Sequence, residues 1–296
     1  MGFRRIRLAI IAMALATVVY FVLSICGAIA MMEIPRIRLG DPPDSFSYKD
    51  VSFTSRGDGV VLNGWYIPGN GSYAIIIVHG GFQNRVDYNV DTLGLATDLL
   101  NEGYDILLFD LRGRGQSEGK GLYLSNIERD IGGAVDYLKN RGYSAEDIGI
   151  IGFCSGAASA LIFASQENIG ALVLDGVFDS VENLITTEMS HRGIPKFAFD
   201  LLFPGILLMA ETIYHYELIN PIDVVATIDC PILFIHEEQD ESISLEETQR
   251  LMAASAKPRN ELWQVSQAEH SHGYRTHPSI YIEKVSTFFA TTEARR

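Results

Sequence analysis

A strand that runs directly into a Gly-x-Cys-x-Gly turn constrains this chain more than any other feature of its sequence. The apolar run 148–151 continues into Gly-Phe-Cys-Ser-Gly at 152–156 and then into small residues typical of a closely packed helix. Glycines two positions before and after a residue let the chain reverse there from strand to helix, with that side chain projecting from the turn. The pattern predicts a nucleophile at Cys154. Ser155 does not fit, because bulky Phe153 would then occupy the first small position.

An ordinary strand-to-helix turn around a buried cysteine would share this pattern, because a free cysteine is commonly a core residue. The interpretation of the turn therefore depends on the rest of the chain.

The first 32 residues carry a separate signal. Arg4, Arg5 and Arg7 precede 25 consecutive uncharged residues, Leu8 to Met32. As a helix, this segment would be about 37 Å long, enough to cross a hydrocarbon core of about 30 Å. The apolar region of a cleaved signal peptide has only about 7 to 15 residues. We therefore expect an uncleaved transmembrane anchor at 1–33, with signal cleavage after Ala28-Ile29-Ala30 as the alternative.

Basic residues are concentrated before the apolar segment, whereas Arg36 and Arg38 after it are mixed with Glu33 and Asp41. This asymmetry favours a single-pass membrane protein whose main domain lies on the extracytoplasmic side. Residues 34–48 include two consecutive prolines and predict a short, stiff linker.

Beyond residue 32 the chain carries 20 basic and 37 acidic side chains, a formal charge of −17. Such a surface repels nucleic acid phosphates and anionic headgroups, so neither is an expected partner. The three cysteines, at 26, 154 and 230, form no disulfide framework and no metal-ligand spacing with histidine. We expect no metal and no cofactor.

Short apolar runs alternate with helical patterns through residues 49–292. Two β-rich stretches, 51–54 and 60–67, predict an antiparallel hairpin. Later runs resemble strands buried on both faces: 73–78, 105–109, 148–151, 171–174, 231–235 and 262–265. Helical patterns lie at 90–102, 126–140, 156–166, 244–256 and 279–290. The alternation predicts one α/β domain with a doubly wound, mostly parallel sheet that binds ligands at the carboxyl ends of its strands.

Residues 180–220 interrupt this alternation. Their apolar side chains are too dense for a one-sided surface helix, which predicts a small helical cap inserted into the domain. A buried crossover helix is the alternative. If the insert caps the site, it selects the substrate.

Four segments follow one another in the chain: His79-Gly80-Gly81-Phe82 after the third strand, the D-x-R-G-x-G-x-S turn at 110–117, the elbow at Cys154, and the pair formed by Asp240 and His270. Taken together and in this order, they resemble the α/β-hydrolase superfamily over residues 50–290. Within the superfamily, the chain is similar to membrane-anchored bacterial hydrolases named by analogy with serine aminopeptidases and esterases. The order nucleophile, acid, histidine is the order of that superfamily. The glycines at 113 and 115 lack the spacing of a dinucleotide-binding loop and predict a structural turn.

The resemblance implies a triad and an oxyanion hole. Asp240, after the seventh strand, is the expected acid, with Asp175 after the sixth strand as the alternative. His270, in a Glu-His-x-x-x-Tyr sequence, is the expected base, with His272 as the alternative. The amides of Gly81 and Ser155 are expected to bind the oxyanion. His79 and His236 are expected to be hydrogen-bonded structural residues, and His277, like His272, lies close enough to His270 to complicate the assignment.

Cysteine departs from the family, whose members here usually have serine at the elbow. A few α/β hydrolases that resemble dienelactone hydrolase use Cys, His and Asp. A helix N-terminus and a nearby imidazolium both stabilise a thiolate, so Cys154 would need little help from a base. A thiolate attacks activated esters, lactones and thioesters readily, whereas an amide requires protonation of a poor leaving group.

The sequence therefore predicts a membrane-anchored hydrolase acting on a small-molecule ester, lactone or thioester through Cys154, His270 and Asp240. An amidase or aminopeptidase with the same triad is the alternative enzyme. A degenerate hydrolase fold that only binds a ligand is the alternative outside enzymes, because cysteine can arise by loss of a nucleophilic serine. The retained Asp240 and His270 argue against that alternative.

Overall fold

The structure is a computed structural model that describes residues 2–39, 47–124, 126–255 and 257–293. It separates into two compact units. The larger unit consists of Ile34–Leu184 and Ile219–Arg296, and the smaller unit consists of Met1–Glu33 and Ile185–Leu218.

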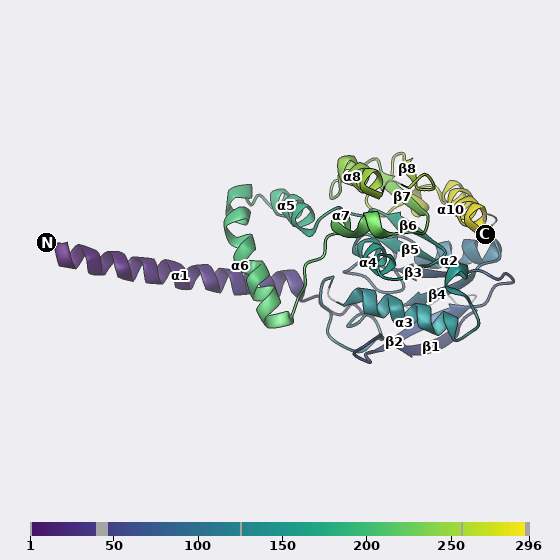
Figure 1. The fold of residues 1–296 in the computed structure, drawn as a ribbon, viewed down its shortest axis with the longest axis horizontal. Helices are drawn as coiled ribbons and strands as arrows, with labels where there is room; N and C mark the ends of the chain where they lie inside the picture. The colour runs from purple at the N-terminus through teal and green to yellow at the C-terminus, as the bar shows by residue number, and fades with distance from the viewer. Residues whose placement is uncertain (1, 40–46, 125, 256, 294–296) are drawn as a thin grey trace. The chain divides into compact units, whose positions relative to one another are not determined.

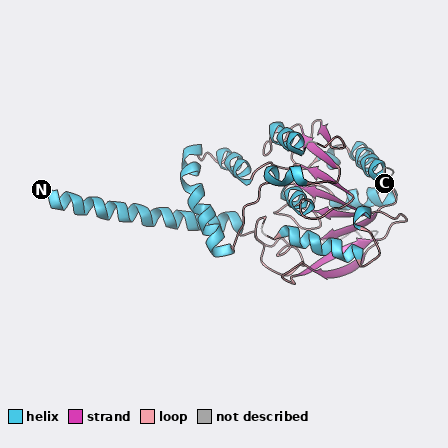
Figure 2. Ribbon diagram, in the orientation of Figure 1, coloured by secondary structure: helices cyan, strands magenta, loops and turns pink. Residues whose placement is uncertain are grey.

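An eight-stranded sheet forms the centre of the larger unit, in the order β1-β2-β4-β3-β5-β6-β7-β8 (Figures 1 and 2). β1 and β2 form an antiparallel hairpin, β2 is also antiparallel to β4, and the remaining neighbours are parallel. The strands are β1 Lys49–Thr54, β2 Val61–Ile67, β3 Ala74–Val78, β4 Asp105–Phe109, β5 Ile148–Phe153, β6 Ala171–Asp175, β7 Ile232–Glu237 and β8 Glu261–Val265. Each strand matches a predicted run to within two residues at either end.

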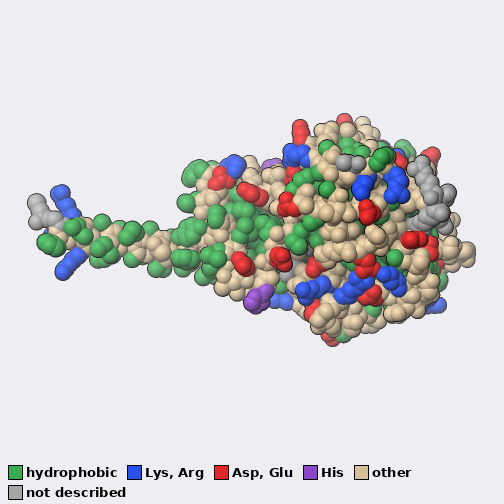
Figure 3. Space-filling view, in the orientation of Figure 1, with side chains coloured by type: hydrophobic (Ala, Val, Ile, Leu, Met, Phe, Trp, Pro, Cys, Tyr) green, Lys and Arg blue, Asp and Glu red, His purple; other side chains and the backbone are tan. Residues whose placement is uncertain are grey.

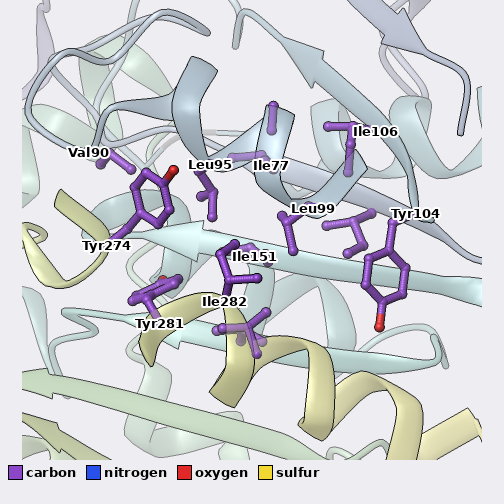
Figure 4. Packing of buried hydrophobic residues seen from close by; sticks show 14 of the residues in the cluster. Ile77, Val90, Leu95, Leu99, Tyr104, Ile106, Ile151, Tyr274, Tyr281 and Ile282 are labelled. Carbon is purple, nitrogen blue, oxygen red and sulfur yellow. The ribbon is translucent and has the colours of Figure 1, made fainter. Parts of the chain in front are cut away.

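Every residue of β3 to β7 is buried, because helices cover both faces of the sheet. The helices of this unit are α2 Thr92–Asn101, α3 Ile127–Lys139, α4 Ser155–Ala164, α7 Pro221–Val224, α8 Leu245–Ser255, α9 Gly273–Thr276 and α10 Pro278–Glu293, with short 3-10 turns at Ala145–Asp147 and Val225–Thr227. α2 and α10 pack against one another and against the apolar cluster shown in Figure 4. α3 and α4 pack together as a second helical layer. The larger unit has the α/β-hydrolase fold, as predicted.

The first residues after the N-terminal helix bind to the larger unit. The Ile34 amide donates to the Gly121 carbonyl (2.9 Å), and Arg36 Nη1 donates to the carbonyls of Gly115 (3.0 Å) and Ser117 (2.6 Å). The start of the segment predicted as a short, stiff linker, 34–48, is therefore hydrogen-bonded to the rest of the larger unit. Residues 40–46 of that prediction lie outside the described residues.

The smaller unit is built from α1 Gly2–Met32 and α6 Lys196–Tyr214, and α5 Val181–His191 precedes α6. α1 packs on α6 through its carboxyl-terminal part, whereas its first half has almost no protein cover. Hydrophobic side chains cover α1 apart from the basic side chains at its amino end (Figure 3). α5 and α6 occupy the predicted insert at 180–220, and its role as a cap over the site stays a prediction.

Candidate active site

Cys154 stands at the junction of β5 and α4 with φ 52° and ψ −119°, a conformation that few residues other than glycine adopt. The two flanking glycines explain how the turn closes. A Cβ on Gly152 would lie 2.6 Å from Ala157 Cα, and a Cβ on Gly156 would lie 2.5 Å from the Val78 carbonyl oxygen. The chain therefore forms the strained elbow that its sequence predicts, and the Cys154 side chain is partly exposed while Ser155 is buried.

His270 and Asp240 meet at the carboxyl end of the sheet. His270 Nδ1 lies 2.6 Å from Asp240 Oδ2, and the Asp240 side chain is fully buried. The other carboxylate oxygen accepts the amides of Ser242 (2.8 Å) and Ile243 (2.9 Å), which orients the carboxylate toward the ring. Loop residues after β7 thus hold the acid, and the loop after β8 holds the histidine.

The His270 imidazole also faces Cys154, and both Cys154 and Asp240 affect the pKa of His270. Burial lowers the pKa of His270, but the negative charge of Cys154 and the hydrogen bonds with Asp240 and Cys154 outweigh burial and raise the pKa well above its ordinary value. The structure therefore brings the three predicted residues together, with the His270 imidazole facing both Asp240 and Cys154.

The alternative acid, Asp175, lies at the end of β6 and makes different contacts. Its Oδ2 accepts the Tyr281 hydroxyl at 2.8 Å, and its carboxyl group interacts electrostatically with that of Glu237. Asp175 and Glu237 are both fully buried, and burial raises the pKa of each, that of Glu237 well above its ordinary value. Asp240, rather than Asp175, is hydrogen-bonded to His270. The sequence reasoning missed Glu237, which sits three residues before Asp240.

The turn after β3 lies against the elbow. A Cβ on Gly80 would be 3.8 Å from Cys154 Cβ, and a Cβ on Gly81 would be 2.7 Å from Ser155 Oγ. Within the described residues, neither the Gly81 nor the Ser155 amide donates to a protein acceptor. Two N–H groups are thus free at the elbow, in the region where an oxyanion would form.

His79 fixes the orientation of this turn. Its Nε2 accepts the Leu111 amide (3.1 Å), so the ring hydrogen is on Nδ1, which donates to the Gly80 carbonyl (2.7 Å). Burial lowers the pKa of His79 to about 3 and keeps the ring neutral. In a trans peptide the carbonyl and the following N–H point in opposite directions. By holding the Gly80 oxygen, His79 sets the direction of the Gly81 N–H. His79 is thus a hydrogen-bonded structural residue, as predicted.

Buried charges support the same turn from the loop after β4. Arg114 Nε donates to the Gly81 carbonyl (3.0 Å), and burial lowers its pKa to about 10, which leaves it charged at neutral pH. Asp110 accepts the amides of Arg85 (2.8 Å) and Gln116 (2.8 Å). The D-x-R-G-x-G-x-S segment is thus a structural turn, as predicted, and the sequence did not indicate its contact with Gly81.

His272, His277 and His236 make contacts different from those of His270. His272 Nδ1 is 3.6 Å from Glu269 Oε2, and His277 Nε2 is 2.9 Å from the Ser266 carbonyl. His236 is buried on β7, but its Nδ1 has no hydrogen-bond partner among the described residues. The expectation that His236 is a hydrogen-bonded structural residue is therefore wrong at Nδ1.

The sheet topology and the strained strand-to-helix elbow are those of the α/β-hydrolase fold. The family model described as the alpha/beta hydrolase fold matches residues 73–198. The chain is 28% identical over 236 residues to the uncharacterized protein YqkD of Bacillus subtilis, covering 78% of this chain and 75% of YqkD. It is also 28% identical over 208 residues to the uncharacterized protein Rv2307c of Mycobacterium tuberculosis, covering 68% of this chain and 66% of that protein.

Among solved structures, the esterase Pf2001 of Pyrococcus furiosus superposes with a TM-score of 0.75 at 26% identity, covering 88% of this chain and 98% of the esterase. The esterase RhEst1 from Rhodococcus, at 15% identity and a TM-score of 0.61, shows the shared fold.

Proposed function

We propose that this α/β hydrolase cleaves carboxylic esters, lactones or thioesters, with Cys154 as nucleophile, His270 as proton carrier and Asp240 as orienting acid. The observation that carries the proposal is the 2.6 Å contact between His270 Nδ1 and buried Asp240, on an imidazole that also faces the elbow thiol. That contact fixes the His270 tautomer and directs the other ring nitrogen to the reacting atoms.

In the proposed reaction, the Cys154 thiolate attacks the substrate carbonyl carbon and the carbonyl oxygen becomes an oxyanion. The free amides of Gly81 and Ser155 stabilise that charge. Protonated His270 then transfers its proton to the departing alkoxide or thiolate, which leaves an acyl-thioester on Cys154. Water attacks this thioester while His270 accepts a proton, and the products are a carboxylic acid and the restored thiolate–imidazolium pair.

The proposal favours an activated acyl substrate over an amide, because the leaving group of an activated ester or thioester departs without full protonation, whereas an amine must be protonated as it leaves. Phe82, next to Gly81, is 59% exposed and packs on Tyr123 with ring centroids 5.9 Å apart, which offers an apolar surface for an acyl chain. The name of the Pf2001 neighbour, an esterase, agrees with this substrate class.

The proposal includes an uncleaved membrane anchor. α1 is apolar over Phe3–Met32 with a mean hydropathy of 2.6, and only 6% of its most apolar stretch is buried in protein. Arg4, Arg5 and Arg7 at its amino end favour a catalytic unit on the extracytoplasmic side. Proteolysis of intact cells tests this orientation: the catalytic unit should be cut without permeabilisation, and full protection would place it in the cytoplasm.

Acyl probes that form stable adducts with thiols or with serine hydroxyls test the chemistry. The full chain should be labelled by the thiol-reactive probe at Cys154, and Cys154→Ala should abolish labelling and hydrolysis of a p-nitrophenyl ester. His270→Ala should reduce turnover by about 10³-fold or more, and Asp240→Asn by less. His272→Ala is the matched control and should retain the wild-type rate. Unchanged hydrolysis in both Cys154→Ala and His270→Ala would favour the ligand-binding alternative, and efficient cleavage of aminoacyl amides would favour the aminopeptidase.

A further inference from the structure

α1 and α6 approach each other closely at two glycines. A Cβ on Gly27 of α1 would lie 2.6 Å from Ile206 Cδ1, and a Cβ on Gly205 of α6 would lie 2.7 Å from the Tyr20 hydroxyl and also contact Ser24. Ser24 Oγ donates to the Tyr20 carbonyl (2.8 Å), so its polarity is satisfied within α1. Small residues that let two helices meet backbone to backbone are a packing mode common in membranes.

The opposite face of α6 is apolar and uncovered. Phe197, Leu201 and Leu208 are 73%, 65% and 49% exposed, and Pro204 between them is also exposed. Their spacing of four, three and four residues places these four side chains, here called the α6 stripe, on one face over about 16 Å of helix. An exposed ion pair, Lys196 Nζ to Asp200 Oδ1 at 2.6 Å, lies beside the stripe.

α6 is long and apolar enough to cross a bilayer, with 19 residues and a mean hydropathy of 1.5, but the topology of the chain excludes a crossing. Leu184 before α6 and Ile219 after it belong to the same compact unit. α5, at 11 residues or about 16 Å, is too short to return across a core of about 30 Å. An apolar stripe flanked by charges on a helix that cannot span is the pattern of a helix lying in the membrane interface.

We propose that the α6 stripe is inserted among the lipid acyl chains of the leaflet from which α1 emerges, and that the enzyme takes its acyl substrate from that leaflet. We assign lipid as the partner of the α6 stripe because the stripe is continuous with α1, the proposed anchor. α6 packs on the carboxyl-terminal part of α1, whose exposed Phe21, Val22 and Ile25 require an apolar solvent themselves. The Tyr214 hydroxyl donates to Glu33 Oε1 (2.8 Å), which marks the polar end of the helix pair.

The proposed substrate class rests on the point along the chain at which the insert joins the catalytic unit. α5 and α6 are inserted after β6, which pairs with β5, the strand that leads into Cys154. A lipid-embedded insert at that point favours long-chain esters or thioesters dissolved in the leaflet over water-soluble ones. This substrate assignment rests on the proposed hydrolase function, whereas the placement of α6 does not.

Depth-dependent fluorescence quenching tests the placement in the full chain. In a Cys26→Ser, Cys154→Ser background, Cys230 is buried with its pKa raised to about 12 by burial, so an introduced cysteine is the reactive site. Leu201→Cys and the control Asp200→Cys are labelled with a polarity-sensitive dye in phosphatidylcholine vesicles. Lipids with a nitroxide near the headgroup should quench the label at 201 at least about threefold more than at 200. Equal, water-like emission at both sites, or stronger quenching at 201 by nitroxides at the bilayer centre, would overturn the proposal.

Hydrolysis of two esters tests the substrate assignment with Cys154 intact. Phe197→Ser/Leu201→Ser should lower kcat/KM for p-nitrophenyl myristate in vesicles by about tenfold, and should change that for soluble p-nitrophenyl acetate by less than about twofold. Lys196→Ser/Asp200→Ser is the matched control on the neighbouring face and should resemble wild type with both esters. Equal effects on the two esters would contradict delivery from the leaflet. Absence of hydrolysis of either ester by wild type would instead contradict the proposed function and leave the quenching result to decide the placement of α6.

Discussion

The carboxyl groups of Asp175 and Glu237 interact electrostatically at the carboxyl ends of β6 and β7, where neither side chain reaches solvent. Neither Glu237 oxygen nor Asp175 Oδ1 has a hydrogen-bond partner among the described residues. Two carboxylates cannot both ionise in such a space, so one of the pair must hold a proton. Burial and the charge of Asp175 raise the pKa of Glu237, which identifies Glu237 as the protonated member.

Glu237→Gln should stabilise the protein, increasingly so as the pH rises. The stability contributed by protonated Glu237 is fully present below its unfolded pKa of about 4.3 and is lost as the pH rises through its raised folded pKa. Glutamine keeps the donor and has no such loss. Unfolding should therefore show a gain of about 1 to 3 kcal/mol at pH 8 and little gain at pH 4.5. Glu283→Gln, an exposed site, is the control with the same charge change. A gain that does not depend on pH would mean that Glu237 is not protonated.

His79→Ala should lower kcat by about 10 to 100-fold and change KM by less than about threefold, because the Gly81 N–H stabilises charge that develops only in the transition state. His79 acts as a positioning residue through the Gly80 carbonyl (2.7 Å). His277→Ala is the matched control, since His277 also binds a carbonyl, that of Ser266 (2.9 Å), but away from the elbow. A raised KM with unchanged kcat would instead indicate a role in binding.

Much of the fold was predictable because the pattern of apolar residues within each short segment indicates its environment. β3 to β7 are short apolar runs, and a strand that is apolar on both faces is typical of the centre of a parallel sheet. The elbow was predictable because only glycine is small enough at positions 152 and 156, where other backbone atoms approach closely. Asp240 and His270 followed from the resemblance to a family whose loops after the seventh and eighth strands carry these residues.

Glu237 could not be predicted, because a Glu-Glu-Gln-Asp run after a strand resembles a solvated loop until the strand is seen to extend through Glu237. The pairing of α1 with α6 could not be predicted either. It joins segments about 180 residues apart through Gly27 and Gly205, and isolated glycines in apolar helices do not identify a partner.

Cys154→Ala should lower the pKa of His270 toward or below its unperturbed value of about 6.5. The charge of Cys154 is the largest effect that raises this pKa, and without it burial, which lowers the pKa, is opposed by Asp240 alone. Titration of the His270 ring by nuclear magnetic resonance measures the change, and Asp240→Asn in the same background should lower the pKa further. A His270 pKa that is unchanged by Cys154→Ala would show that the thiolate does not face the imidazole.

Gly156→Ala should disrupt the elbow, whereas Gly80→Ala should be tolerated. An added Cβ at Gly156 would meet the Val78 carbonyl oxygen at 2.5 Å and also the His79 carbonyl, and backbone atoms in a buried sheet cannot move aside. At Gly80 the nearest atoms would be 3.8 Å away, which is ordinary van der Waals contact. We expect a loss of about 2 to 4 kcal/mol in the free energy of unfolding for Gly156→Ala and less than about 1 kcal/mol for Gly80→Ala. Chemical denaturation of the two variants measures both values, and equal losses would mean that close approach at residue 156 does not hold the elbow in place.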